Sequence, residues 1–454
     1  MTKRFYLLSL GCPKNAVDAE AMRGLLQDAG WRETKRPDRA DVLIVNTCGF
    51  IEPAREESYA ALRELAQVKR SNQVLLAAGC LSQRYGEGVR RAVPGVDGVI
   101  GTREWANIVP RVEQLLGMQC SVRPRGEVSV VTPMRRQADG PSAYLKIADG
   151  CSAPCAFCAI PLIKGPQRSK HRTAILDEAR QLVAQGVQEI ILIAQDTTAY
   201  GRDLGEMDAL PSLIEDILQT VPFLRWLRLM YTYPQHVTSR LIECMAGHAQ
   251  ICHYLDLPLQ HAHPATLRRM RRSPDIESVR QLIANLRQAM PDISLRTAFI
   301  VGYPGETEKE FNALLDFMAE VAFDKVGVFT YSREEGTTAA GLPDPVPHEL
   351  AEERYARAMQ LQRGISLARN RLQVGRTLDV LIEGAEQGIS VGRSYRDAPE
   401  IDGYVFVGGE WPVGQMLAAR IERALDYDLE GQALALHSSQ GRGFLLLSGT
   451  PEAR

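Results

Sequence analysis

Short apolar runs that alternate with longer amphipathic stretches constrain the fold of this chain more than any other feature of its sequence. In the first third of the chain, the apolar runs cover residues 5–10, 42–46, 74–78 and 96–100. Amphipathic stretches such as 16–29 and 54–68 lie between them. Buried strands that alternate with helices are typical of β/α units on a parallel sheet. We therefore expect residues 1–117 to form an α/β domain with a parallel sheet.

The same alternation returns between residues 142 and 373. Its six candidate strands cover residues 143–148, 189–194, 226–230, 254–257, 294–300 and 325–329. A complete eight-stranded barrel needs two further β/α units and usually more residues. We therefore expect a partial (β/α)6 barrel, followed by a long helix over residues 349–373.

Residues 374–447 change to short strand-like pieces separated by glycine and aspartate turns. The pieces cover residues 377–383, 388–393, 403–407, 416–424 and 444–447. This pattern is typical of a small β-barrel. Residues 118–141 lack periodicity and gather Pro, Arg and Gly, so we expect a linker there. The predicted fold class is α/β, with a parallel-sheet domain, a partial barrel and a small C-terminal β-barrel.

Composition and charge place the 454-residue chain among globular proteins. Hydrophobic residues make up 45% and charged residues 24% of it, unlike a disordered chain. The formal net charge of −2 provides no overall basic field for nucleic acid. No apolar run is long enough to cross a bilayer, and the stretch 5–10 is too short for the core of a signal peptide. We expect a cytoplasmic protein with no membrane partner.

Three of the nine cysteines, Cys151, Cys155 and Cys158, form a closely spaced motif, and we call them the loop cysteines. An odd number of cysteines in a reducing compartment favours metal binding or catalysis over a disulfide framework. The motif follows the first predicted barrel strand, at the end of the barrel where active sites lie. Three thiolates on a short loop can hold one face of a cubane iron–sulfur cluster and leave one iron open. The alternative is a zinc site with a remote fourth ligand, although zinc loops usually combine two cysteine pairs.

A second set, which we call the N-terminal cysteines, consists of Cys12, Cys48 and Cys80. Each of them follows a predicted strand of the first domain. Because the carboxyl ends of parallel strands share one edge of the sheet, we expect the three thiols to converge there. They predict a second three-cysteine cluster site. The alternative is three small buried side chains, which is the interpretation we prefer for Cys120, Cys244 and Cys252.

The cysteine loop, with Phe157 before its last cysteine, resembles that of the radical S-adenosylmethionine enzymes. The resemblance implies that the open iron binds the amino and carboxylate groups of S-adenosylmethionine. One electron from the cluster then cleaves this cofactor to a 5′-deoxyadenosyl radical. The glycine-rich turn after the fifth predicted barrel strand and the end of the second strand are also similar to cofactor-binding segments of that family. The implied cofactor-binding residues are Phe157, Gln195, Asp196, Gly302, Pro304, Gly305 and Glu306.

Over nearly its whole length, the chain resembles the methylthiotransferases within this superfamily. The resemblance implies two 4Fe-4S clusters, one on the loop cysteines and one on the N-terminal cysteines, and makes all six residues catalytic. It also implies that S-adenosylmethionine serves as both radical source and methyl donor, and that the second cluster carries the sulfur. A C–H bond at an unactivated carbon has no useful acidity, which is why such a reaction needs a radical. An electron donor such as flavodoxin or ferredoxin is implied as a partner.

Three segments are similar to the branch of this family that modifies a ribosomal protein rather than tRNA. They are residues 9–15, 194–201 and 257–261. The implied substrate is small-subunit ribosomal protein twelve, free or in the assembling small subunit, modified at the β-carbon of one aspartate. The alternative is a tRNA adenosine next to the anticodon. A further rival is an iron–sulfur assembly factor or a zinc scaffold with no catalytic activity.

The charge of the C-terminal barrel bears on this choice. The barrel resembles the TRAM module, which binds RNA in the tRNA branch. Residues 375–443 contain six basic and eleven acidic side chains, a net charge of −5. Such a charge opposes a polyanion and suits a basic ribosomal protein, so we expect no tRNA partner.

Two basic features do not follow from the family resemblance or from the acidic charge of the C-terminal barrel. Lys164 occupies a position where the family generally has Arg, so the bidentate guanidinium fork is lost. The basic run 268–272 could contact phosphates or could form a solvated helix face.

Overall fold

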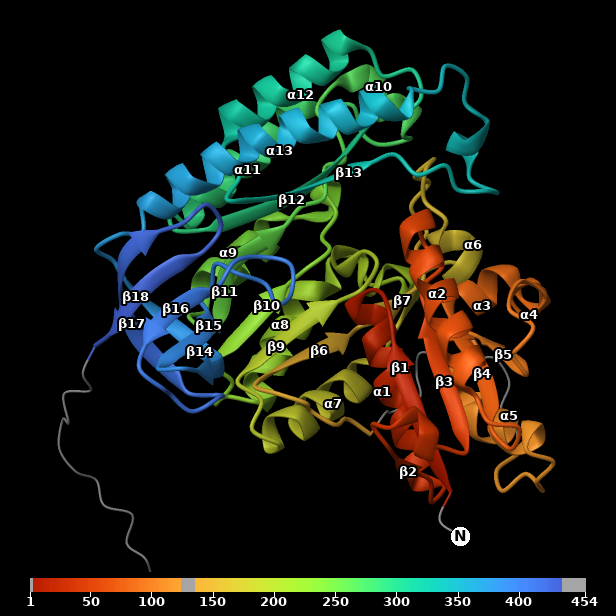
Figure 1. Ribbon diagram of the computed structural model, residues 1–454. Coiled ribbons are helices and arrows are strands. Elements are labelled where there is room, and N and C mark those ends of the chain that lie inside the picture. Colours follow the sequence, from red (N-terminus) through yellow and green to blue (C-terminus); the bar gives the residue numbers. More distant parts are fainter. Residues whose placement is uncertain (1–2, 124–134, 435–454) are drawn as a thin grey trace, which may run out of the picture.

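The structure is a computed structural model, and it describes residues 3–123 and 135–434. Within these residues three main sheets follow one another along the chain (Figure 1). A five-stranded sheet from the N-terminal part and a closed barrel from the C-terminal part flank a six-stranded sheet in the centre. This three-part arrangement confirms the predicted fold class.

The N-terminal sheet is parallel and has the strand order β2-β1-β3-β4-β5. Its strands are β1 (Arg4–Ser9), β2 (Arg32–Glu33), β3 (Val42–Thr47), β4 (Val74–Gly79) and β5 (Gly98–Gly101). The helices of this part are α1 (Pro13–Asp28), α2 (Glu52–Val68), α3 (Cys80–Tyr85), α4 (Glu87–Ala92) and α5 (Ile108–Leu115). Every residue of β3 is buried, which explains the apolar run at residues 42–45, and the buried Asn46 and Thr47 follow at its carboxyl end. The short edge strand β2 is an addition to the four predicted strands.

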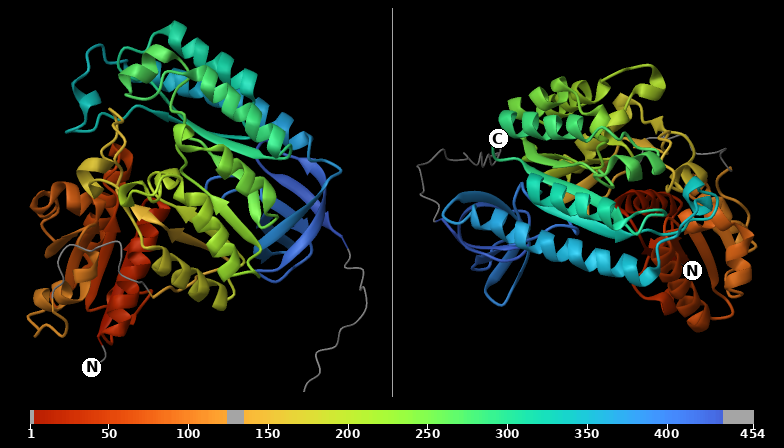
Figure 2. Two further views of the ribbon diagram at one scale, coloured as in Figure 1. Left: turned by 180° about the vertical axis from the view of Figure 1, so that it is seen from behind. Right: turned by 90° about the horizontal axis from the view of Figure 1, so that it is seen from above.

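The central sheet is also parallel and has the order β13-β12-β11-β10-β9-β6. Its strands are β6 (Ser142–Lys146), β9 (Glu189–Ile193), β10 (Trp226–Leu229), β11 (Ile251–Asp256), β12 (Ser294–Val301) and β13 (Lys325–Thr330). The helices that connect and cover it include α7 (Arg172–Ala184), α8 (Ala209–Thr220), α9 (Ser239–Gly247), α10 (Pro264–Arg269), α11 (Ile276–Ala289) and α12 (Glu308–Val321). The sheet has two edges, β6 and β13, so it is an open, partial barrel as predicted. The long helix α13 (His348–Arg371) runs beside α12 toward the C-terminal barrel (Figure 2).

The N-terminal sheet and the central sheet share one hydrophobic core. Val17 and Met22 of α1 belong to the same buried cluster as Ile191 and Ile193 of β9 and Tyr254 of β11. Helix α1 also contacts the edge strand β6. The N-terminal part therefore covers the open side of the partial barrel.

The C-terminal strands form a closed barrel in the order β14-β15-β16-β18-β17. They are β14 (Thr377–Glu386), β15 (Ile389–Arg393), β16 (Val405–Gly408), β17 (Met416–Ala424) and β18 (Leu429–Ala433). The sequence predicts the first four, but it predicts the fifth at residues 444–447, which lie outside the described residues. β18 closes the barrel instead, and only its Leu429 belongs to the buried core, so it lacks an apolar pattern.

Buried ion pairs attach this barrel to the central sheet. Arg393 Nη2 of the barrel donates to Glu189 Oε2 of the central sheet at 2.6 Å. Arg228 of the central sheet pairs with the other oxygen of Glu189 at 2.7 Å and donates from Nη1 to Tyr395 O at 2.7 Å. Arg396 Nη2 donates to Asp324 Oδ1 at 2.8 Å. Arg393 and Arg396, which the net charge of residues 375–443 includes, are thus buried rather than on the surface.

Among the described residues, no helix is both long enough and apolar enough to cross a membrane.

Candidate functional site

The N-terminal cysteines lie at the carboxyl ends of three neighbouring strands. Cys12 comes just before α1, Cys48 directly follows β3, and Cys80 opens α3 directly after β4. Cys48 and Cys80 are buried, whereas Cys12 is exposed. The structure thus brings the three residues to one edge of the N-terminal sheet.

Two glycines allow these strand ends to approach one another closely. Gly11 has a φ of +85°, and a Cβ at this residue would lie 2.7 Å from Cys48 Cβ. A Cβ at Gly49 would lie 3.0 Å from the carbonyl carbon of Cys80. A side chain at either position would therefore force the segments that carry Cys12, Cys48 and Cys80 apart.

Burial controls the acidity of the Cys48 and Cys80 thiols. It raises the pKa of Cys80 to about 12, and the ammonium group of Lys164 acts in the opposite direction. Burial also raises the pKa of Cys48, and the nearby Cys12 adds to the rise. Thiols of this kind are neutral near pH 7 and become thiolates when a metal binds. The chemistry of the donor set therefore fits a soft metal centre.

The loop cysteines lie between two short antiparallel strands, β7 (Ala148–Asp149) and β8 (Arg168–Ser169), which the sequence did not predict. Gly150 has a φ of +75°, and a Cβ there would lie 2.2 Å from Pro166 O. Cys151 N donates to Gly165 O at 3.0 Å. These contacts bring the two ends of the loop together.

Inside the loop, the backbone turns around the sulfur atoms. Cys158 N donates to Cys155 O at 3.3 Å, and Ala153 N donates to Cys151 Sγ at 3.4 Å. Burial raises the pKa of Cys158 to about 12, while the guanidinium of Arg272 favours the thiolate. An N–H donor and a nearby positive charge both stabilise thiolate ligands of a metal centre.

Within residues 3–123 and 135–434, no three His, Cys, Asp or Glu side chains stand close enough to hold one metal ion together. A closed zinc site needs four ligands around one ion, so the zinc alternative has no ready set of ligands among these residues. The ligands of a four-iron cluster bind separate irons and are spaced more widely. The assignment of both sets of cysteines to iron–sulfur clusters stays a prediction.

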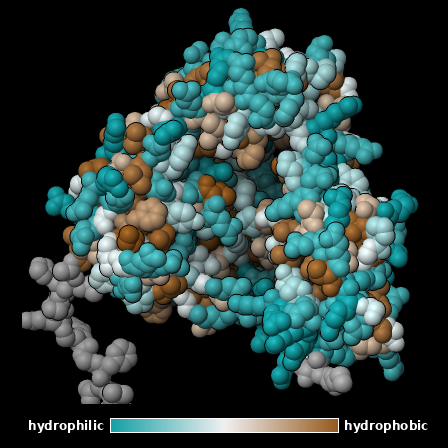
Figure 3. Space-filling view, viewed as in Figure 1, coloured by the Kyte–Doolittle hydropathy of each residue, from teal (hydrophilic) through white to brown (hydrophobic). Residues whose placement is uncertain are grey.

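The two sets of cysteines adjoin each other through a short helix, α6 (Ile160–Lys164). Cys80 forms a buried apolar cluster with Ala159 and Ile163, which come directly after the last loop cysteine. Arg103 Nε of the N-terminal part donates to Ile163 O at 3.1 Å. On this side of the molecule, the surface is hollowed where the N-terminal part faces the central sheet (Figure 3).

A buried group of two aspartates and two lysines joins the two sets. Asp18 of α1 pairs with Lys164 Nζ at 2.7 Å and with Lys146. Asp149 Oδ2 lies 3.2 Å from both ammonium groups. Burial alone would raise the pKa of Asp149, but Lys146 and Lys164 hold it well below its usual range. Lys164 therefore makes point contacts with two carboxylates, which do not need the fork of an arginine.

Lys14 of α1 is a further buried cation beside the N-terminal cysteines. Its Nζ lies 2.8 Å from the centroid of the Tyr231 ring. Burial lowers the pKa of Lys14 to about 8, whereas the charges of Cys12, Asp256 and Asp149 oppose the decrease. Residues 9–15 carry a family resemblance, but no local pattern predicts a role for Lys14, because its position against Tyr231 depends on the packing between the N-terminal part and the central sheet.

Gln195 and Asp196 follow β9 at the same end of the barrel. Gln195 Nε2 donates to Asp149 Oδ1 at 3.0 Å, while its Oε1 is buried and has no hydrogen-bond partner in the structure. Asp196 accepts hydrogen bonds from Thr198 Oγ1 at 2.6 Å and Ala199 N at 3.1 Å, and its Oδ2 lies 2.9 Å from His236 Nδ1. The orphaned amide oxygen of Gln195 is therefore available to a bound polar group.

The predicted cofactor turn follows β12. Gly302 and Gly305 both have a φ of +72°, a conformation that favours glycine, and Pro304 lies buried between them. Both oxygens of the Glu306 side chain are used within the protein. Oε2 accepts from Gly302 N, from Tyr303 N at 3.2 Å and from Arg354 Nη1 at 3.1 Å, and Oε1 lies 3.1 Å from His261 Nε2. In the structure Glu306 thus holds the shape of the turn.

The basic run 268–272 supports the cysteine loop. Met270 is fully buried, and its carbonyl accepts from Ala156 N at 2.9 Å. Phe157 packs against the cluster that contains Met270 and Tyr303. The guanidinium of Arg272 lies 4.5 Å from the centroid of the Tyr233 ring. Part of this run is therefore built into the site rather than presented on a solvated helix face.

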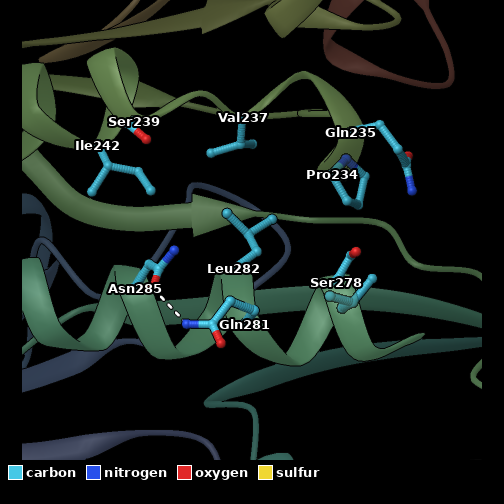
Figure 4. A pocket seen from close by; sticks show the side chains of 10 residues that line it. Pro234, Gln235, Val237, Ser239, Ile242, Ser278, Gln281, Leu282 and Asn285 are labelled. Carbon is cyan, nitrogen blue, oxygen red and sulfur yellow. Dashed lines mark hydrogen bonds between the residues drawn. The ribbon is translucent and has the colours of Figure 1, made fainter. Parts of the chain in front are cut away.

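A separate pocket of about 270 Å³ opens on the outer layer between α9 and α11 (Figure 4). Val237, Ile242 and Leu282 line it together with polar side chains such as Asn285. None of the predicted site residues lines this pocket.

Comparison with known families divides the described chain into the same three parts. Residues 4–101 match the family described as "Uncharacterized protein family UPF0004". Residues 145–318 match the radical SAM superfamily, and residues 374–434 match the TRAM domain. Fold and site together define the class of the protein: it is a radical SAM enzyme.

Curated relatives cover nearly the whole chain. The protein named "Ribosomal protein uS12 methylthiotransferase RimO" of Chloroflexus aurantiacus is 50% identical over 95% of this chain and 100% of its own length. Proteins with the same name from a Roseiflexus species and from Heliobacterium modesticaldum are 48% and 46% identical. These two matches cover 97% and 96% of this chain, and 99% and 96% of the relatives. The chain belongs to the RimO family of methylthiotransferases.

Solved structures support the fold at low sequence identity. The radical S-adenosylmethionine methyltransferase TsrM from Kitasatospora setae, solved with cobalamin and a [4Fe-4S] cluster, has a TM-score of 0.57 and 13% identity. The match covers 86% of this chain and 81% of TsrM. The cobalamin-dependent radical enzyme OxsB has a TM-score of 0.51 and 10% identity, over 80% of this chain and 56% of OxsB.

Proposed function

We propose that this methylthiotransferase modifies ribosomal protein uS12 at the β-carbon of one aspartate, with S-adenosylmethionine as both radical source and methyl donor. The printed names of the relatives, at 50% and 48% identity over nearly the full chain, support uS12 as the substrate. They do not favour the alternative of a tRNA adenosine. The site supports an enzyme rather than a scaffold, because it gathers thiols, buried charges and an orphaned amide oxygen at one end of the barrel.

The observation that carries the proposal is the contact of Cys80 with Ala159 and Ile163, which follow the loop cysteines in the chain. We assign Cys151, Cys155 and Cys158 to a 4Fe-4S cluster that generates the radical. We assign Cys12, Cys48 and Cys80 to a second 4Fe-4S cluster that carries sulfur. The contact of Cys80 with Ala159 and Ile163 supports a short path between them.

When it is bound at the loop cysteines, S-adenosylmethionine supplies a radical that can remove hydrogen from an unactivated carbon. Gln195 offers its free Oε1 to the polar groups of this cofactor. Gly302, Pro304 and Gly305 present backbone without side-chain bulk, and Glu306 keeps that turn in shape. Phe157 packs against the cluster that contains Met270 and covers that side of the cysteine loop. Asp196 stays hydrogen-bonded and holds the segment that follows β9.

The chain's own residues also fix the position of the N-terminal part against the central sheet. Arg84 Nη1 donates to Gly49 O at 3.0 Å and to Glu334 Oε2 at 2.5 Å, and Arg55 also pairs with Glu334. Arg84 and Glu334 are both nearly buried. This contact connects the strand end that carries Cys48 to the loop after β13. It keeps the N-terminal part seated on the barrel.

The surface of the C-terminal barrel supports a basic protein partner. Two of its arginines, Arg393 and Arg396, are buried, and exposed Arg423 is paired with Glu430. Its exposed acidic residues are Asp379, Glu386, Glu400, Glu410 and Glu422. An acidic surface attracts a basic ribosomal protein and repels a polyanion. A flavodoxin or ferredoxin donor, a cytoplasmic location and the assembling small subunit as the form of the substrate stay predictions.

An anaerobic competition assay tests the proposal. The reconstituted full chain, reductant, sulfide and S-adenosylmethionine are incubated with unmodified uS12 and unmodified tRNA in one tube. Mass spectrometry then locates the methylthio group, which we expect on an aspartate of uS12. A methylthio group on tRNA would overturn the substrate, and cleaved cofactor without any methylthio product would require a third substrate.

A further inference from the structure

Lys14 is a buried cation next to the N-terminal cysteines. It lies in the first turn of α1, two residues after Cys12, and its exposed fraction is 8%. Its ammonium group lies over the face of Tyr231, which follows β10 at the carboxyl end of the central sheet. Substrates of barrel enzymes bind at this end.

Among the described residues, Lys14 has no direct ion-pair partner, although Cys12 lies nearby and becomes a negatively charged ligand when a metal binds. Among the ion pairs of residues 3–123 and 135–434, none within 4.0 Å joins Lys14 to a carboxylate. The nearby aspartates already have partners: Asp149 pairs with Lys146 and Lys164, and Asp256 Oδ1 accepts from Arg296 Nη1 at 2.8 Å. A cation–π contact compensates only part of the cost of burying an ammonium group. A ligand with a negative charge can pair with this ammonium group directly.

Arg272 also has no carboxylate within 4.0 Å among the described residues, but it lies on the other side of the site. Its charge acts on Cys151 and Cys158, and it packs on Tyr233. Under the proposed function, S-adenosylmethionine binds next to the loop cysteines. Lys14 belongs to the side of the N-terminal cysteines, where the modified carbon must come close to the sulfur.

We propose that Lys14 binds the side-chain carboxylate of the aspartate that is modified, and so selects an acidic residue as substrate. This inference rests on the proposed function. An aspartate keeps its carboxylate during methylthiolation, and its β-carbon is bonded directly to that group. A cation that holds the carboxylate therefore fixes the β-carbon between the two sets of cysteines. The substrate carboxylate in turn is the direct ion-pair partner that no carboxylate of the described residues provides to Lys14.

A binding experiment with two substrates and two enzymes tests this role. Full-length reconstituted enzyme, either wild type or Lys14→Met, is titrated anaerobically with uS12 that carries Asp or Asn at the modified position. We expect the wild type to bind the Asp protein about 10- to 100-fold more tightly, as one buried hydrogen-bonded charge predicts. Lys14→Met should bind both proteins alike. An undiminished preference for Asp in Lys14→Met would overturn the inference, as would equal binding of both substrates by the wild type.

Matched variants separate this role from structural effects. Lys14→Arg keeps the positive charge and should keep a preference for Asp. Lys69→Met removes a lysine at the opposite edge of the N-terminal sheet, where it pairs with Asp97 at 2.5 Å, and should keep the full preference. Iron content and cofactor cleavage are measured for each variant. If Lys14→Met loses its iron, the wild type and Lys14→Arg decide the outcome. A wild type that cleaves the cofactor but leaves uS12 unmodified would instead overturn the proposed function.

Discussion

Lys164 Nζ lies 2.7 Å from Asp18 Oδ2, so the residue that ends α6 is bound to a helix of the N-terminal part. Because α6 begins directly after the loop cysteines and α1 begins directly after Cys12, this pair joins the two sets of cysteines. Lys146 also pairs with Asp18. The geometry of the site therefore depends on a contact between two domains.

Asp18→Asn should destabilise the protein markedly. Asp18 is 1% exposed, and its loss leaves Lys146 and Lys164 to share Asp149. Breaking a buried ion pair in this way costs about 3 kcal/mol. Denaturant unfolding of the full chain measures the change. Asp38→Asn is the control, because Asp38 pairs with Arg36 on the surface. The denaturant midpoint of this variant should equal that of the wild type. Equal effects of the two variants would contradict the account.

Gly11→Ala should remove iron from the N-terminal cysteines and spare the loop cysteines. The added Cβ would meet Cys48 Cβ at 2.7 Å, so the strand ends must separate. Iron analysis after reconstitution should show about half of the wild-type content. Gly30→Ala is a matched control, because Gly30 has the same φ of +85° but nothing within 4 Å of its added Cβ. Full iron content in Gly11→Ala would show that the close approach is not required.

Acid should weaken the attachment of the C-terminal barrel through Glu189. Burial alone would raise the pKa of Glu189, but Arg228 and Arg393 lower it to about 2 from its ordinary value of 4.5. Its contribution to stability is therefore present above pH 4.5 and is lost as the pH falls toward 2. This contribution amounts to about 3 kcal/mol at neutral pH.

The measurement compares wild type with Glu189→Gln by denaturant unfolding at a series of pH values. The variant should be less stable at neutral pH, and the difference should shrink as the pH falls below 4.5. A difference that stays constant over this range would contradict the assignment.

Glu334→Gln should reduce methylthio transfer more than cofactor cleavage. Glu334 binds Arg55 and Arg84 of the N-terminal part. The neutral variant therefore weakens the contact between that part and the barrel. The loop cysteines are not part of this contact. Cleaved cofactor and methylthiolated uS12 are quantified in the same reaction. Glu335→Gln changes an exposed neighbour and should leave both yields unchanged. If Glu334→Gln lowered cofactor cleavage and methylthio transfer equally, Glu334 would do more than attach the N-terminal part to the barrel.

Sequence reasoning predicted the sheets well because their strands carry a strong local pattern. β3 is buried along its whole length, and its first four residues form an apolar run. The same logic placed Cys12, Cys48 and Cys80 at strand ends. β18 was missed because Leu429 is its only residue in the buried core. The antiparallel pair of β7 and β8 was missed because each strand has only two residues.

The residues between the two sets of cysteines were harder to predict. Asp18, Lys146 and Lys164 are charged side chains that meet only when two domains pack together, so no local period marks them. Arg393 and Arg396 were counted as surface charge but are buried against Glu189 and Asp324. Whether these charged side chains are buried depends on how the domains pack together. The sequence pattern of a single segment carries no information on that packing.

The central claim is that the two sets of cysteines perform different halves of one reaction. The most direct measurement follows cofactor cleavage and methylthio transfer to uS12 in two full-length variants, Cys155→Ala and Cys48→Ala, after anaerobic reconstitution. Cys155→Ala should lose both activities, whereas Cys48→Ala should retain cofactor cleavage and lose methylthio transfer. Full methylthio transfer by Cys48→Ala would contradict the account.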